Sequence, residues 1–428
     1  MTGIQRISVV LAASTTMGIA PPEVFSAAEL AALDPSVRMV SLCSGRDRGS
    51  SMPGMLALAA LVVEPQLPAA IPLYDGLGKI DFPITTAQPL AQRYFNQGMG
   101  FAYGFNHAAA IASFRAAQKL DPGCAMCWWG EALAHGPNIN APITPDANAL
   151  ALKAIGADAA RLARTTPTER ALIMALATRY SARPDAVRAT LDGAFADAML
   201  ALARVYPAHD DISLLAAEAA MDTLPWDYWE PDKQSAKPRL GEAVRLVEAV
   251  MARNPDHPQG NHLYIHLMEN GPDPKRAEAA ADRLAKPLAG DAGHMVHMPA
   301  HIYYRLGRWK DSMRVNLDAA RKDEAYISQA DDKGFVRYGY YPHNVHFIVT
   351  SAQMAGDLPT AIREAKRGEA RRLTTTPALA KAPNNGWALY GLAASERALG
   401  RRTHAAAAQL TLGRACSGDP RWLRMERL

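Results

Sequence analysis

The feature that most constrains the fold is a set of small and aromatic residues that recurs at fixed intervals between residues 94 and 122. The positions are Gly98, Phe101, Ala110, Phe114, Ala117 and Pro122. Small residues allow the two helices of a pair to cross closely, and larger residues fill the gap to the next pair. Because one helix pair cannot bury its apolar face alone, the spacing predicts an array of stacked helix pairs.

Weaker copies of this pattern follow along the chain. They contain Gly130; then Tyr303, Gly307, Trp309 and Ala319; then Ala352, Gly356 and Ala361; and last Gly400 and Ala405. Apolar residues at helical spacing predict further helices over 186–206 and 240–254, and no long stretch alternates with a period of two. Residues 74–428 are therefore predicted to form an all-α, tetratricopeptide-like right-handed superhelix of helix-turn-helix repeats.

Composition excludes several classes of protein. The 428 residues carry 46 Lys and Arg against 42 Asp and Glu, so the formal charge of +4 is too small to indicate a nucleic-acid binder. A content of 49% hydrophobic residues excludes a disordered chain. No apolar run reaches the roughly 18 residues of a membrane span, so we expect no transmembrane segment.

Residues 1–73 are predicted to be an N-terminal extension. Two apolar stretches in it, 7–13 and 55–63, follow arginines and end near small residues, which is typical of a secretory signal. If either stretch is a signal, the protein is periplasmic or secreted; otherwise it is cytoplasmic. A poorly packed N-terminal arm is the alternative.

The spacing of Cys124 and Cys127 fits a disulfide, a redox pair or half of a zinc site. No second Cys-x-x-Cys pair accompanies them, which argues against a zinc site with four thiolates. Because the surrounding run is typical of a helix start, we interpret both as ordinary small buried residues.

Histidines gather in three short motifs. The motifs contain His262, His266 and Glu269; His294, His297 and His301; and His343 and His346. At roughly 100° per residue, each motif keeps its side chains on one helical face. Because proline favours the first turn of a helix, Pro299 predicts a helix that starts near His297 and leaves His294 on the loop before it.

These motifs predict a metal site. Imidazole binds zinc, copper, iron and nickel, and equivalent faces of successive repeats point to the same side of a superhelix. His107, between the helices of the first pair, is a further candidate ligand. Eight histidines exceed the needs of one ion, so we expect one or two transition-metal ions, with any remaining histidines free to orient ligands or move protons.

The identity of the metal stays open between copper, iron and zinc. Nitrogen ligands favour copper or zinc over magnesium or calcium, and paired copper sites use about three histidines each. Non-haem iron takes two histidines and one carboxylate, a set that His262, His266 and Glu269 supply. Glu269 is the catalytic candidate, either as a ligand or as a general base.

Other residues could line a pocket for a small organic substrate. The candidates are Asn138, Asn140, Trp226, Tyr264, Tyr303, Arg305 and Tyr341. The two asparagines interrupt the second repeat, Trp226 lies at another break, and the others accompany the histidine motifs. Capping by asparagine and core packing by the aromatic residues are the alternatives.

Several of these stretches resemble those of a group of bacterial tetratricopeptide-repeat proteins. They are Phe105-Asn106-His107, Gly136-Pro137-Asn138-Ile139-Asn140, Pro225-Trp226, Asn261-His262-x-Tyr264-Ile265-His266, His297-Met298-Pro299-x-His301-Ile302-Tyr303 and Tyr341-Pro342-His343-Asn344-x-His346-Phe347. The similarity extends over residues 74–370 and implies the repeat fold, but no particular activity.

The interpretation that we favour is a metal-dependent enzyme that acts on a small organic substrate inside the superhelix. Redox chemistry with copper or iron is favoured, and zinc-dependent hydrolysis is the first alternative. The second alternative is a non-catalytic repeat protein that binds a peptide, a protein partner or a metal in its concave groove.

Overall fold

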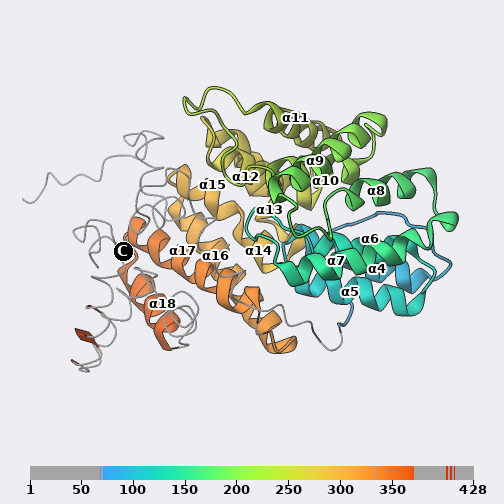
Figure 1. Cartoon of the computed structure of the whole chain (residues 1–428). Coiled ribbons are helices and arrows are strands. Elements are labelled where there is room, and N and C mark those ends of the chain that lie inside the picture. Colours follow the sequence, from blue (N-terminus) through green and yellow to red (C-terminus); the bar gives the residue numbers. More distant parts are fainter. Residues whose placement is uncertain are drawn as a thin grey trace, which may run out of the picture.

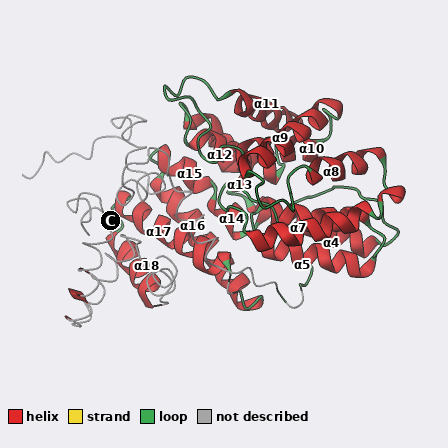
Figure 2. Cartoon of the chain, viewed as in Figure 1, coloured by secondary structure: helices red, strands yellow, loops and turns green. Residues whose placement is uncertain are grey.

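The computed structural model of the chain describes residues 71–332 and 334–370, together with a few isolated positions. Every regular element in this part of the chain is a helix, with two isolated β-bridges and no strand (Figure 2). The predicted all-α class is thus confirmed for these residues. The two signal-like stretches and the last expected repeat copy, at Gly400, lie outside the described residues.

The α-helices are α4 (Pro89–Tyr103), α5 (His107–Leu120), α6 (Ala125–Ala134), α7 (Pro145–Ala159), α8 (Pro167–Ala177), α9 (Arg188–Val205), α10 (Asp210–Asp222), α11 (Pro238–Arg253), α12 (Pro258–Glu269), α13 (Glu278–Leu284), α14 (Gly293–His297), α15 (Pro299–Arg305), α16 (Trp309–Gln329), α17 (Tyr341–Met354) and α18 (Leu358–Ala370). Three short 3-10 segments and a π-helical turn, Val336–Tyr340, lie between them. Consecutive helices pack on one another, as α4 on α5, α9 on α10 and α16 on α17. Figure 1 shows α4–α7 at one end and α16–α18 at the other, with α12–α15 between them.

The first helix pair crosses at a glycine, as its pattern predicts. A Cβ atom added to Gly98 of α4 would lie 2.5 Å from the ring of Phe114 on α5, and one added to Gly130 of α6 would lie 2.4 Å from the same ring. Phe114 is fully buried. The small residues therefore lie where helix and ring come too close for any larger side chain.

A buried carboxylate also joins α5 to α6. Glu131 of α6 lies 2.7 Å from the Arg115 guanidinium and accepts a hydrogen bond of 2.6 Å from Gln118. Burial alone would raise the pKa of Glu131, but hydrogen bonds from His135, Arg115 and Gln118 outweigh burial and lower this pKa to about 2.

Helices α9 and α11 correspond to the two helices predicted over 186–206 and 240–254. Two other expectations are wrong. His294 does not lie on a loop but inside the short helix α14, because the chain forms one helix up to His297 and Pro299 begins another. Cys124 and Cys127 are joined in a disulfide at the start of α6. No described helix combines the length and the apolar character needed to cross a membrane.

Candidate metal centre

Four helices in the middle of the chain carry the histidines. His262 and His266 lie one turn apart on α12, whose first turn begins at Pro258. The next motif is divided between α14 and α15, and His343 lies in the first turn of α17. The packing of α12 against α15, and of α14 and α17 against α16, brings these motifs together.

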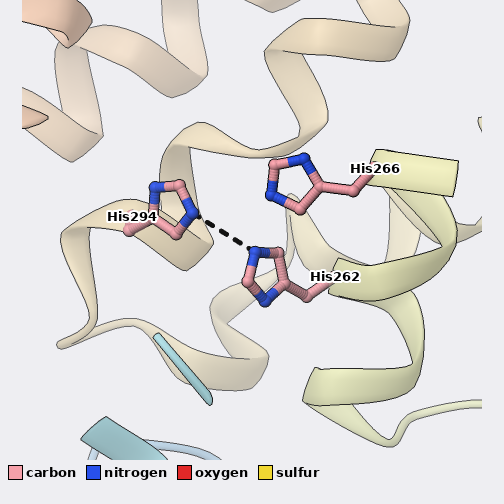
Figure 3. Close-up of side chains that lie close together, drawn as sticks. All are labelled: His262, His266 and His294. Atoms are coloured by element: carbon pink, nitrogen blue, oxygen red, sulfur yellow. Dashed lines mark hydrogen bonds between the residues drawn. The ribbon is translucent and has the colours of Figure 1, made fainter. Parts of the chain in front are cut away.

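The first triad consists of His262, His266 and His294, all buried. One nitrogen of each lies within 4.8 Å of the others, and the Nε2 atoms of His262 and His294 are 3.2 Å apart. Figure 3 shows the two rings of α12 converging on the ring of His294. A tetrahedral ion with Zn–N bonds of 2.0–2.1 Å would hold its nitrogens about 3.3 Å apart, so this separation is close to that of a metal site.

The second triad consists of His297, His301 and His343. The Nε2 atom of His297 lies 2.8 Å from Nε2 of His301 and 3.1 Å from Nε2 of His343. His297 and His301 are buried, and His343 is half-buried. The two triads adjoin, because the ring centroids of His294 and His297 are 6.0 Å apart and those of His266 and His301 are 6.1 Å apart.

Hydrogen-bond acceptors lie behind four of the six rings, at Nδ1. Gln259 Oε1 is 3.0 Å from Nδ1 of His262, and Asn316 Oδ1 is 2.6 Å from Nδ1 of His297. The NH2 group of Gln259 donates to Glu218, and the NH2 group of Asn316 donates to the backbone oxygen of Ser312. The oxygen of each amide is therefore the atom that faces the histidine. Nδ1 therefore carries the proton, and Nε2 presents a lone pair.

Glu269 serves one ring of each triad. Its Oε1 atom is 2.8 Å from Nδ1 of His266, and its Oε2 atom is 2.7 Å from Nδ1 of His301. Burial alone would raise the pKa of Glu269, but the charge and hydrogen bonds of His301 and His266 lower this pKa to about 2. Glu269 is predicted to be a ligand or a general base, and in the structure its two oxygens face the Nδ1 atoms of His266 and His301.

The contact between His297 and His301 needs a proton or a metal ion between the two rings. Both rings face an acceptor through Nδ1, and their Nε2 atoms lie 2.8 Å apart. Burial, with a further contribution from His301, lowers the pKa of His297 well below its usual value, which disfavours a second proton on this ring. A metal ion bound by both nitrogens satisfies this arrangement.

The other triad rings also favour the neutral form. Burial and the neighbouring imidazoles hold the pKa values of His262, His294 and His343 well below the usual range. The Nε2 atom of His266 is buried without a hydrogen-bond partner in the protein. Neutral imidazoles with unused Nε2 atoms are the form that binds a metal ion.

Aromatic rings enclose both triads. The ring centroid of Phe105 is 4.7 Å from that of His262, that of Trp226 is 5.0 Å from that of His266, and that of Phe347 is 5.0 Å from those of both His297 and His301. Phe105 and Trp226 have φ angles of 53° and 65°, in the left-handed region that large side chains rarely adopt. Strain of this kind persists where surrounding structure holds it, often at functional sites.

A cavity reaches the first triad at His294. Its wall includes Phe101, Tyr326, Asp323 and Tyr340, and the Tyr340 ring centroid lies 4.4 Å from that of His294. The Nδ1 atom of His294 has no hydrogen-bond partner in the protein. This wall joins aromatic surface to a few polar groups, as the walls of small-molecule sites do.

Two candidate ligands lie outside the triads. His346 belongs to neither, although it is one turn from His343. His107 starts α5, and its Nε2 atom lies 3.1 Å from Nδ2 of Asn138. It lines a different cavity, together with Arg179, Glu218 and Asp222.

The candidate substrate residues divide into two groups. Trp226 contacts His266, and Asn140 donates a hydrogen bond of 3.4 Å to Tyr340, so both lie near the first triad. The hydroxyl groups of three tyrosines bond to carboxylates of other helices instead: Tyr264 to Glu248, Tyr303 to Asp282 and Tyr341 to Glu324. Arg305 is buried at the end of α15.

Sequence reasoning did not find Gln259 and Asn316 as supporting residues. Gln259 could have been found, because it precedes His262 by three residues and so shares its helical face. Asn316 gives no such signal, because α16 carries no histidine. Phe105 and Phe347 lie in the histidine motifs but were not assigned a role.

Comparison with known proteins adds no assignment to this geometry. No model of a known protein family matches the chain. No curated protein matches it either.

Proposed function

We propose that the protein is a metal-dependent enzyme with a dinuclear histidine centre, formed inside a tetratricopeptide-like superhelix and acting on a small organic substrate. The observation that carries the proposal is the convergence of two buried histidine triads, His262, His266 and His294 and then His297, His301 and His343, with Asn316 and Glu269 behind the rings of His297 and His301. Acceptors also lie behind the rings of His262 and His266. The similarity of the motifs to bacterial tetratricopeptide-repeat proteins supports the repeat architecture.

The ligand set favours copper, with iron as the alternative. Five of the six imidazoles have a lowered pKa, which favours their neutral form, so two divalent ions would bring four positive charges into a buried site whose nearest counter-charge is Glu269. Burying uncompensated charge is costly, and copper can be bound as Cu(I), with one charge fewer, whereas zinc stays divalent. When bound, such ions would supply electron transfer to and from the substrate.

The residues around the ions have separate roles in this proposal. His262, His266, His294, His297, His301 and His343 hold the ions. Phe105, Trp226 and Phe347 exclude water from the rings they contact. The substrate would approach the first triad at the cavity beside His294, whose wall includes Tyr340.

Zinc-dependent hydrolysis is less favoured. The predicted hydrolase would use Glu269 to take a proton from water, and both oxygens of Glu269 are engaged with imidazole Nδ1 atoms. A scaffold that binds only a peptide or a protein partner would not need six converging imidazoles with acceptors behind four of them.

Metal analysis of protein purified without a histidine tag tests the proposal. We expect two tightly held ions per chain, with visible absorption if they are copper or iron. Replacing His262 and His297 together by Ala should abolish binding and leave helical content intact, because packing between repeats does not depend on the metal. A protein that binds no copper, iron or zinc after reconstitution would refute the proposal.

A further inference from the structure

The proposed centre contains two triads, and one residue contacts both. Glu269 ends α12, which carries His262 and His266, and reaches across to His301 on α15. Its carboxylate is buried, with 3% of the residue exposed. Each of the other two acceptors contacts one triad: Gln259 contacts His262 of the first, and Asn316 contacts His297 of the second.

The geometry makes the two bonds of Glu269 interdependent. One rigid carboxylate group places Oε1 at 2.8 Å from His266 and Oε2 at 2.7 Å from His301. A rotation that improves one bond therefore moves the other oxygen as well. Among the groups that lie behind the six rings in the described chain, this carboxylate is also the single ionised acceptor.

We infer that Glu269 is a shared positioning residue that raises the affinity of both metal sites, so that the two ions depend on one carboxylate. This inference rests on the proposed function, because it presupposes that the triads bind metal. An ion at Nε2 draws electron density from its imidazole and strengthens the hydrogen bond that the opposite Nδ1 donates. Glu269 receives that bond from a ring of each triad, and its negative charge offsets part of the charge of both ions.

The two sites can be measured separately with Zn²⁺ as the probe. His343→Ala disables the second triad and leaves the first, and His262→Ala does the reverse, and neither substitution removes a bond of Glu269. In each background, competition with a chromophoric chelator gives the affinity of the remaining site. Loss of a residue that orients a metal ligand lowers affinity about 10–100-fold.

Glu269→Ala should weaken Zn²⁺ binding about 10–100-fold in both backgrounds. The matched controls should each act in one background: Gln259→Ala on the first triad alone and Asn316→Ala on the second alone. Circular dichroism shows whether each variant is folded. If Glu269→Ala fails to fold, Glu269→Gln replaces it, because an uncharged amide can accept a hydrogen bond from one ring but not from both; at least one site should then weaken by that factor.

The outcomes separate this inference from the proposed function. Two tight sites in the parent protein, with a folded Glu269→Ala that weakens one site or neither, would overturn the shared role and leave the metal centre standing. An unchanged affinity of both sites in folded Glu269→Gln would overturn it in the same way. Absence of Zn²⁺ binding from the parent protein and from both backgrounds would overturn the metal centre and, with it, this inference.

Discussion

Replacing Phe105 by glycine should destabilise the protein less than replacing it by alanine. Its φ angle of 53° is left-handed, and its ring lies over the first triad, 4.7 Å from His262 between centroids. A non-glycine residue in this conformation costs roughly 1–2 kcal/mol, whereas glycine adopts it freely. The residue thus keeps a strained backbone in the same place where its ring encloses the histidines.

The magnitude follows from three contributions to the free energy of unfolding. Loss of the buried ring costs about 3–5 kcal/mol in either variant. Glycine then recovers the strain of roughly 1–2 kcal/mol but loses about 0.5–1 kcal/mol to the greater freedom of the unfolded chain. Phe105→Gly should therefore be more stable than Phe105→Ala by up to about 1.5 kcal/mol, with a middle value of about 0.75 kcal/mol.

Phe347 provides the matched control. It is also buried against triad histidines, but it lies inside helix α17, where glycine is less stable than alanine by about 1 kcal/mol. In urea unfolding of the four metal-free variants, the glycine variant should thus be more stable than the alanine variant at position 105 and less stable at position 347. A Phe105→Gly protein that unfolds at a lower urea concentration than Phe105→Ala, with equal slopes, would refute the argument from backbone strain.

Three further predictions concern helix packing, acid stability and the ligand set. Gly98→Ala should lower stability by about 1–3 kcal/mol in thermal unfolding, because its Cβ would lie 2.5 Å from the Phe114 ring; an unchanged melting temperature would contradict the close crossing. The pKa of Glu131 falls from 4.5 to about 2 on folding. After allowance for solvent screening, this shift contributes about 2 kcal/mol to the free energy of unfolding. The contribution is present above pH 4.5 and is lost as the pH falls towards 2. Glu131→Gln should accordingly be less stable than the parent at pH 7 and approach it near pH 2; a constant difference in urea unfolding across this range would show that the charge is not responsible. His346→Ala should leave the number of bound ions unchanged in metal analysis, because His346 belongs to neither triad, and loss of an ion would add it to the ligand set.

Local rules predicted the helices and most residues of the two histidine triads. Pro258 and Pro342 lie in the first turns of α12 and α17, and helical spacing places His262 and His266 on one face. These features depend on residues a few positions apart, so a single sequence carries the information. The exception is α14, where Pro299 was read as the entry to one helix although the chain forms two.

The supporting residues could be predicted only in part. Gln259 lies within one turn of the ring it orients, but Asn316 reaches His297 from another helix, and the contact depends on how α14 packs against α16. The role of Glu269 stays open in the sequence for a related reason. A carboxylate three residues after a histidine fits both a ligand and a group behind the ring, and the position of His301 on α15 decides between them.

The division of the histidines into triads does not follow the sequence motifs. His294 and His297 belong to one motif, yet His294 joins the first triad and His297 the second. A separation of three residues turns side chains about 60° apart on a helix, enough for neighbouring rings to serve two adjacent ions. Helix α14 thus contributes a ring to both triads. The ring centroids of His294 and His297 are 6.0 Å apart, which keeps the two triads adjacent. Helical periodicity identifies histidines that face the same way, whereas their assignment to one ion or two depends on the rings that other helices bring to each side.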